Sequence, residues 1–253
     1  QPILGYSDAE HLRPILNTAS SYDPKNPYAN RDPRFYASVY YNGAIRYLDQ
    51  PNGDVVETYV GGNCGISDKV TDIRYTRTGY YMRKFNNFKS GIGQDADGLM
   101  RIFRLAELYL NFAEAAYQAV GPDGQVVSKV GAEALSARDA VNKIRVRAGI
   151  PALSSGMSKD SFEKRYRNER RVELAFEEHR FFDVRRWKIL NETDDFVTGM
   201  KIVKEEDGTF TYNRIKLASR GTNADKYLLY PIKQTEVAKM LKHTGAICQN
   251  PRW

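Results

Sequence analysis

Within Lys164-Arg-Tyr-Arg-Asn-Glu-Arg-Arg-Val-Glu-Leu-Ala-Phe-Glu-Glu-His-Arg-Phe-Phe-Asp-Val-Arg-Arg-Trp187, charged residues occupy positions where an amphipathic helix is normally apolar. On a period of 3.6 residues, Glu169 and Glu173 fall in one stripe with Phe162 and Tyr166. Burial of a carboxylate is unfavourable by several kcal/mol unless a counter-ion pairs with it. The stretch therefore predicts a helix with a buried charge network. The candidate partners are four arginines of the same stretch, Arg170, Arg180, Arg185 and Arg186.

The predicted network is structural. Two carboxylates one helical turn apart could instead be the acid and base of a glycoside hydrolase. Guanidinium partners, however, lower carboxylate pKa values and keep both groups ionised, which suits structure better than proton transfer. A hydrolase that uses Glu169 and Glu173 remains the rival interpretation. We assign the structural role to Glu169, Glu173, Arg180, Asp183 and Arg186.

Composition indicates a globular chain and argues against several classes of protein. The 253 residues are 42% hydrophobic and 12% aromatic, enough for the core of one large domain or two small ones. The net charge is +7, but residues 160–190 hold nine basic and seven acidic side chains, so the excess is diffuse and nucleic-acid binding is not expected. The chain opens on Gln1 without a Met, which suggests a fragment or a processed form.

No cofactor or metal site is predicted. The sequence lacks the HExxH, P-loop and GxGxxG motifs, and its three histidines, His11, His179 and His243, are scattered. Cys64 and Cys248 are too few and too far apart for a zinc module, although one disulfide between them stays possible.

The chain divides into three parts by composition: a loop-rich part at 1–98, a helical core at 99–190 and a loop-rich tail at 191–253. Apolar periodicity and stop signals predict the core helices, at 100–120, 132–148, 160–178 with Asp160 as N-cap, and 181–190 after a bend near residue 178. Runs of aromatic and β-branched residues predict short strands at 35–41, 55–60 and 80–85, and Asp207-Gly208 predicts a hairpin between 201–204 and 210–212. We expect a mostly α protein of helical hairpins with long loop-rich insertions and a few short β-hairpins.

Tyrosines in the loop-rich part are the candidate ligand contacts. The chain has 17 Tyr, and many of them stand beside Asn, Asp and Arg in turn-rich sequence. A phenol ring offers a flat apolar face together with a hydroxyl, a combination that stacks on sugar rings and bonds their hydroxyl groups. The residues chosen on this basis are Tyr41, Asn42, Tyr47, Tyr59 and Tyr75.

Six segments, taken in order, resemble hallmarks of the SusD/RagB family. They are Asn30-Arg-Asp-Pro-Arg-Phe-Tyr36, Thr78-Gly-Tyr-Tyr-Met-Arg-Lys84, Arg104-Leu-Ala-Glu-Leu-Tyr-Leu-Asn-Phe-Ala-Glu-Ala115, the segment from Asn168 to Trp187, Leu229-Tyr-Pro-Ile-Lys-Gln-Thr-Glu236 and Gln249-Asn-Pro251. The matches span nearly all of residues 1–253 but correspond to the C-terminal half of such proteins.

This resemblance implies a SusD-like fold of TPR-type helical hairpins, and a surface-exposed lipoprotein of the outer membrane of Bacteroidota. Membrane contact would come through a lipid anchor in an N-terminal part that lies outside this chain. The implied role is starch or polysaccharide utilisation, in which the protein binds glycans without catalysis and delivers them to a SusC-like TonB-dependent transporter. The alternative is a peptide-binding, RagB-like protein. Tyr47 follows the turn at Asn42-Gly43, at a place where many relatives carry an aromatic residue. It is therefore the first choice as a ligand contact.

Overall fold

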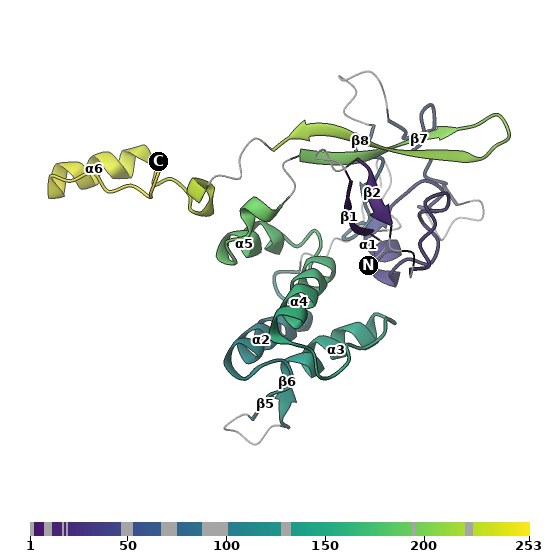
Figure 1. Ribbon diagram of the computed structural model, residues 1–253. Helices are drawn as coiled ribbons and strands as arrows, with labels where there is room; N and C mark the ends of the chain where they lie inside the picture. Colours follow the sequence, from purple (N-terminus) through teal and green to yellow (C-terminus); the bar gives the residue numbers. More distant parts are fainter. Residues whose placement is uncertain are drawn as a thin grey trace.

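A computed structural model describes residues 3–7, 12–16, 18, 20–46, 53–66, 75–87, 101–127, 133–193, 196–220 and 225–253. Three regions are distinct in Figure 1: a group of helices, a loop-rich region beneath a long β-hairpin, and a C-terminal helix that projects away from both. The predicted mostly helical class is confirmed, with antiparallel strand pairs between the helices.

The helical group consists of α2 (Leu105–Val120), α3 (Ala137–Arg147) and α4 (Lys159–Glu173). Alanines and aromatic rings dominate the hydrophobic core that these helices share. Small residues let the helices approach, and the rings of Tyr117, Phe162 and Tyr166 fill the space between them, all fully buried. Gly121 ends α2 with a φ of 81°, as its position in the sequence predicts.

The N-cap of α4 lies two residues before the predicted one. The side chain of Ser158 caps this helix by accepting a hydrogen bond from the backbone N–H of Ser161, so the prediction of Asp160 as N-cap is wrong. Both residues are good capping types, and Glu163, three residues after Asp160, gives a capping-box spacing that favours the wrong one.

The C-terminus of α4 comes earlier than predicted. Phe176 and Glu178 have positive φ values, 65° and 64°, which turn the chain out of the helix after Glu173. The next helix, α5 (His179–Arg186), starts directly after Glu178. The predicted bend near residue 178 is therefore present.

All the strand pairs of the described residues are antiparallel. They are β1 (Ile3–Tyr6) with β2 (Pro14–Leu16), β3 (Val39–Tyr40) with β4 (Tyr81–Met82), β5 (Gln125–Val126) with β6 (Leu135–Ser136), and β7 (Phe196–Lys204) with β8 (Phe210–Ser219). The predicted hairpin around Asp207-Gly208 is confirmed as β7 and β8, and it extends well beyond the predicted strands.

The predicted strand at 35–41 is wrong. Most of it forms the helix α1 (Pro33–Ser38), and only β3 at its end is extended. Asp32 caps α1 by accepting a hydrogen bond from the N–H of Arg34, and proline in the first turn favours helix. These two signals override the β-propensity of the aromatic residues. In the predicted strand at 55–60, Val55 makes an isolated bridge to Ile45.

The long β7–β8 hairpin lies across the loop-rich region (Figure 1). The N–H of Met200 donates to the carbonyl of Thr78 at 2.9 Å, and the N–H of Val60 donates to the carbonyl of Ile202 at 2.9 Å. A Cβ added at Gly79 would come within 2.3 Å of the carbonyl oxygen of Met200, so the close approach requires glycine at this position. Backbone hydrogen bonds thus hold the hairpin against the loop-rich region.

The C-terminal part holds structure that composition did not predict. After the 3₁₀ turns η1 (Leu190–Glu192) and η2 (Asp225–Leu228) comes α6 (Gln234–Thr244), which projects to one side in Figure 1. The side-chain amide of Gln249 bonds both backbone groups of Ile232, at 2.7 and 2.9 Å, and holds the end of the chain beside the start of α6. The tail is therefore less loop-rich than expected.

Candidate functional site: a buried charge network and an aromatic pocket

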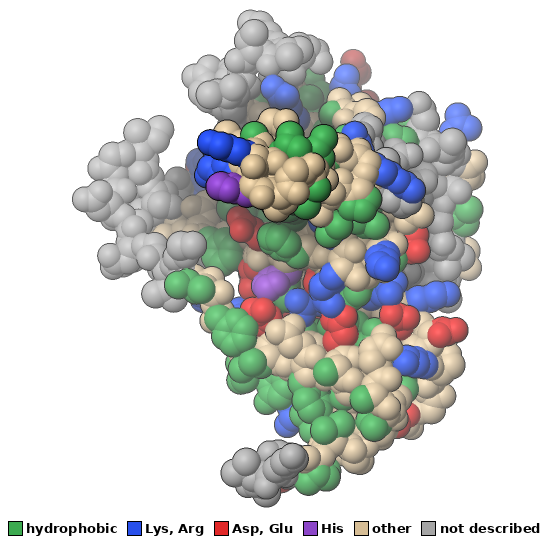
Figure 2. Space-filling model, turned by 90° about the vertical axis from the view of Figure 1, so that its left-hand side faces the viewer, with side chains coloured by type: hydrophobic (Ala, Val, Ile, Leu, Met, Phe, Trp, Pro, Cys, Tyr) green, Lys and Arg blue, Asp and Glu red, His purple; other side chains and the backbone are tan. Residues whose placement is uncertain are grey.

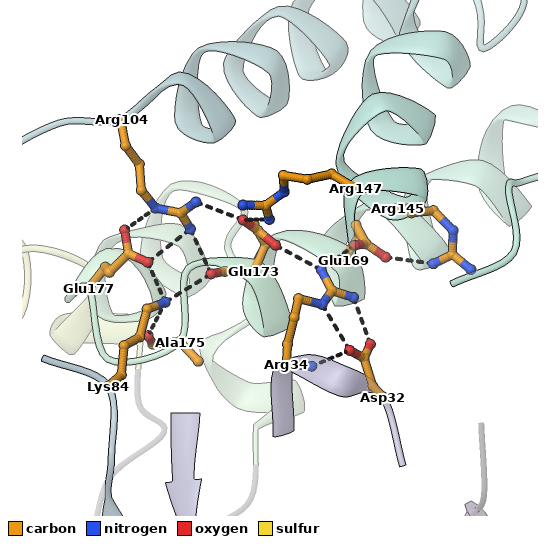
Figure 3. A network of polar contacts seen from close by, with 10 residues as sticks. All are labelled: Asp32, Arg34, Lys84, Arg104, Arg145, Arg147, Glu169, Glu173, Ala175 and Glu177. Atoms are coloured by element: carbon orange, nitrogen blue, oxygen red, sulfur yellow. Dashed lines mark hydrogen bonds and ion pairs between the residues drawn. The ribbon is translucent and has the colours of Figure 1, made fainter. Parts of the chain in front are cut away.

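Glu169 and Glu173 are both buried, each with 3% of its surface exposed, and both are paired. Glu169 accepts from Arg34 and from Arg145, each at 2.6 Å. Glu173 accepts from Arg34 at 2.9 Å, from Arg104 at 2.7 Å and from Arg147 at 2.6 Å. Figure 3 shows Arg34 between the two carboxylates, so one guanidinium serves both.

The arginine partners come from other elements than the sequence indicates. The expected partners lay on the same stretch as the glutamates. The observed ones are supplied by α1, by the residue before α2 and by α3: Arg34, Arg104, Arg145 and Arg147. The network therefore joins the loop-rich region to three elements of the helical group.

A second centre of the network surrounds Asp183. This carboxylate accepts from Arg170 at 2.8 Å and from Arg186 at 2.9 Å. Arg186 also bonds Glu114 on α2, which in turn accepts from the hydroxyl of Tyr166 at 2.8 Å. Asp183 and Arg186, both assigned to the charge network from the sequence, thus pair with each other.

Arg180 does not join this network, contrary to expectation. No carboxylate among the described residues forms an ion pair with it. Burial and the nearby positive charge of Arg171 lower the pKa of Arg180 from its usual value. Its position on α5, after the turn at Glu178, removes it from the stripe on which a continuous helix would have placed it.

The side chain of Lys84 caps the C-terminus of α4. Its ammonium donates to the backbone carbonyls of Glu173 and Ala175, at 3.1 and 3.0 Å, and contacts the carboxylate of Glu177 (Figure 3). A cation is stabilised at a helix C-terminus, where the backbone carbonyls have no helical partner. Lys84 thereby ties the segment that follows β4 to the helical group.

These contacts hold Glu173 and Glu177 ionised. Burial alone would raise the pKa of Glu173, but hydrogen bonds from Arg104 and Arg34 outweigh it and lower the pKa. The pKa of Glu177 is lowered in the same way by Arg104 and Lys84, against the opposing effect of burial. A general acid at neutral pH needs a raised pKa. The arrangement suits structural support and opposes acid catalysis.

An aromatic pocket of about 550 Å³ lies between the loop-rich region and the β7–β8 hairpin. Its lining combines tyrosine and phenylalanine rings with amide and charged groups. The lining residues are Asn26, Tyr28, Ala29, Tyr36, Tyr41, Asn42, Gly43, Val55, Glu57, Tyr59, Lys204, Phe210 and Tyr212.

One wall of the aromatic pocket is built on α1 and the turn that follows it. The hydroxyl of Tyr36 donates to the carbonyl of Tyr28 at 2.6 Å, and the Tyr28 ring packs 4.6 Å from that of Tyr41. Asn42 is buried and accepts from the N–H of Thr58 at 3.0 Å. Gly43 adopts a φ of 90°, which closes the turn. This wall is therefore held by hydrogen bonds from several directions.

The opposite wall comes from the hairpin. Phe210 packs 5.6 Å from the ring of Tyr59, and Tyr212 meets Tyr28 edge to face at 5.5 Å. The ammonium of Lys204 lies 5.4 Å from the centroid of the Tyr59 ring. Rings from residues more than 140 positions apart in the sequence thus complete one cavity.

The tyrosines of the pocket stay neutral. Burial raises the pKa of Tyr41. The neighbouring phenol of Tyr36 has a smaller effect in the same direction. Burial and the adjacent Glu57 raise the pKa of Tyr59, and burial raises that of Tyr212. Their hydroxyls remain protonated at physiological pH, and can both donate and accept hydrogen bonds.

The pocket brings together three of the five residues chosen from the sequence: Tyr41, Asn42 and Tyr59. Tyr75 is half-buried near Tyr81 and does not line the pocket. Tyr47, the first choice, lies outside the described residues.

The residue types in the sequence did not indicate the pocket wall that the hairpin supplies. Phe210 and Tyr212 alternate on a predicted strand, which places both rings on one face, and this spacing was the available signal. Nothing in the spacing indicated which part of the chain that face would meet.

The described part of the chain holds no group of three or more His, Cys, Asp or Glu side chains placed to hold a metal ion. Cys64 and Cys248 are free thiols, so the disulfide that the sequence left possible is not formed. On the face shown in Figure 2, basic and acidic side chains are interspersed, which agrees with the diffuse charge of the sequence.

Comparison with known proteins yields one family. The model of the SusD family matches residues 15–253. Among solved structures, the chain is similar to that of a SusD superfamily protein from Bacteroides vulgatus ATCC 8482, with 20% identity and a TM-score of 0.49. That comparison covers 100% of this chain and 47% of the other, so the chain spans about half the length of the solved protein. No curated protein matches the chain.

Proposed function

The chain belongs to the SusD family, whose members generally bind glycans for nutrient uptake, and we propose that it binds an oligosaccharide in the aromatic pocket without altering it. The observation that carries this proposal is the convergence of Tyr41, Tyr59 and Tyr212 with Asn42 in one open cavity. Aromatic faces stack on sugar rings, while hydroxyl and amide groups bond sugar hydroxyls.

The pocket has the size and chemistry for such a ligand. Small-molecule sites typically occupy roughly 300–1,000 Å³ and combine apolar walls with a few polar groups. The cavity of about 550 Å³ falls inside this range and offers the side chains of Asn26, Asn42 and Glu57 beside its rings. Phenol hydroxyls that remain protonated add donors as well as acceptors.

Binding rather than hydrolysis fits the geometry. The carboxylates with which the rival interpretation begins, Glu169 and Glu173, are saturated by arginines and do not line the aromatic pocket. A glycosidase requires one of its two carboxylic acids to hold a proton near neutral pH, and the lowered pKa of Glu173 opposes that role.

The wider biological role follows from family membership. Proteins of this family are generally lipoproteins at the surface of the outer membrane that work with a transporter. We infer that the intact protein delivers its glycan to a SusC-like TonB-dependent transporter. Among the described residues, no helix has the length and hydropathy to cross a membrane. In this proposal the ligand-facing part is the region before residue 98 together with the hairpin.

A screen on an array of oligosaccharides and peptides tests the proposal. We expect binding to a subset of the glycans, and no released fragments when bound glycan is analysed by chromatography. Binding confined to peptides would replace the glycan proposal by the RagB-like alternative. Cleavage of a glycan would contradict the non-catalytic assignment. Purification from detergent-solubilised outer membranes should recover a TonB-dependent transporter.

A further inference from the structure

Lys204 stands on the face of the β7–β8 hairpin that is turned toward the aromatic pocket. In an antiparallel pair, directly opposed residues project on the same side of the sheet. The register opposes Lys204 to Phe210 and Ile202 to Tyr212. Ile202 is fully buried, and the other three side chains line the pocket. Arg214 and Lys216 lie on the same face farther from the hairpin turn, and neither lines the pocket, so Lys204 is the cation that this face presents to it.

This cation has no carboxylate partner among the described residues. Neither Glu57, which accepts from the N–H of Asn63 at 3.3 Å, nor Glu205, which accepts from the hydroxyl of Thr211 at 2.5 Å, forms an ion pair with it. Among the residues that line the pocket, Lys204 is the sole lysine or arginine. The structure leaves its positive charge available to a ligand.

We propose that the aromatic pocket selects an oligosaccharide with a carboxylate group, such as a uronic acid, and that Lys204 binds the carboxylate. This inference rests on the proposed glycan-binding function and adds the class of sugar. The ammonium lies over the Tyr59 ring, so a sugar that packs in the pocket places a ring substituent within reach of it. Asn42 and Glu57 remain as partners for uncharged hydroxyls.

A purely structural role for Lys204 predicts a different result. A lysine that merely extended its ammonium into water, with its stem on the Tyr59 ring, would give no preference between an acidic sugar and its neutral analogue.

The test compares oligosaccharides in matched pairs, each acidic member with its carboxyl-reduced, neutral analogue. Titration calorimetry on the whole 253-residue chain should show about fivefold tighter binding of the acidic member, the size expected of a partly exposed ion pair. Raised salt should weaken the acidic member alone. Lys204→Met should abolish the preference by weakening the acidic member more than the neutral one, while Lys204→Arg should retain it.

Lys201 provides the matched control. It lies on the same strand, but its register partner is Asn213, so it projects on the other face of the hairpin. Lys201→Met should therefore keep the preference. Equal affinity of the wild type for both members, or a preference that survives in Lys204→Met, would overturn this inference and leave glycan binding standing. Failure to bind any member of any pair would overturn the proposed function, and this inference with it.

Discussion

Nη1 of Arg34 lies 2.9 Å from Oε2 of Glu173, although 139 residues separate the two in the sequence. Arg34 belongs to the first turn of α1. Tyr36, two residues later in the same helix, lines the aromatic pocket. The same guanidinium bonds Glu169 at 2.6 Å. The contact therefore fixes one wall of the pocket to the helical group, and links the stability of the fold to the geometry of the site.

Glu173→Gln should destabilise the protein by about 3–5 kcal/mol, because it removes the buried carboxylate that pairs with Arg34, Arg104 and Arg147. That loss is a large share of the roughly 5–15 kcal/mol that keeps a domain folded. Thermal or urea unfolding followed by circular dichroism measures it. Glu236→Gln is the control, since Glu236 is half exposed and pairs with Lys239 on the surface of α6. Equal unfolding curves for the two variants would contradict a structural role for Glu173.

Stability should fall in acid. The pKa values of Glu173, Glu177 and Glu114 are lowered in the folded chain, where hydrogen bonds from basic and other donors outweigh the effect of burial. Their contribution is complete above the ordinary value of 4.5 and is lost as the pH falls through the lower, folded-state values. The melting temperature should drop steeply below about pH 4.5, and the drop should be smaller in Glu173→Gln. A melting temperature that rises on acidification would refute this.

Tyr59→Ala should weaken glycan binding by about 1 kcal/mol, the usual contribution of one aromatic contact. Tyr59→Phe should lose less, because the ring remains and only the hydroxyl is removed. Calorimetry with a glycan from the array measures both. Tyr230→Ala serves as the control: Tyr230 is 62% exposed and packs on Phe181, away from the pocket. An equal loss in the control would show that the effect is not specific to the pocket.

Position 176 should prefer glycine to alanine. Phe176 has a φ of 65°, a conformation in which a Cβ crowds the following carbonyl at a cost of roughly 1–2 kcal/mol. Phe176→Gly should therefore be more stable than Phe176→Ala by about 1 kcal/mol in chemical denaturation. Phe182, which is exposed on α5, should show the opposite order. The same order at both positions would argue against the positive φ.

Ser158→Ala should destabilise α4 by about 1 kcal/mol, because it removes the side-chain oxygen that accepts from the N–H of Ser161. Asp160→Ala removes a charge from the first turn but no cap, so its effect should be smaller. Thermal unfolding of the two variants side by side decides between them. A larger effect at Asp160 would restore the N-cap predicted from the sequence.

The helices of the core were predictable because their signals are local. Apolar residues recur at helical spacing in α2, and glycine ends it at the expected place. Likewise, Asp207-Gly208 marks the turn between β7 and β8 within a few residues. Such features depend on neighbours in the sequence, and periodicity is sufficient to find them.

The partners of the buried charges could not be predicted in the same way. Burial of Glu169 and Glu173 requires cations, yet any arginine can meet that requirement. The choice of Arg34 and Arg145 depends on how α1 and α3 pack on α4, which a periodic pattern does not specify. The assignment of Arg180 to the network was wrong for the same reason, because the direction of its side chain depends on the turn at Glu178.

The lining of the aromatic pocket was predicted only in part, for a related reason. Tyr41, Asn42 and Tyr59 share one turn-rich segment, so composition alone singles them out. Lys204 and Tyr212 belong to a hairpin far along the chain, and their contribution appears only when that hairpin crosses the loops. The role of the pocket residues in binding stays a prediction until a ligand is measured.

The division of the pocket between two distant segments also has a consequence for how the protein is made. Synthesis proceeds from the N-terminus, so Tyr41 and Tyr59 leave the ribosome long before Phe210 and Tyr212 exist. Contacts of such large sequence separation form slowly, because the intervening chain must first lose its freedom. The cavity is therefore completed late, and a growing chain should be unable to capture ligand until the hairpin has emerged and docked.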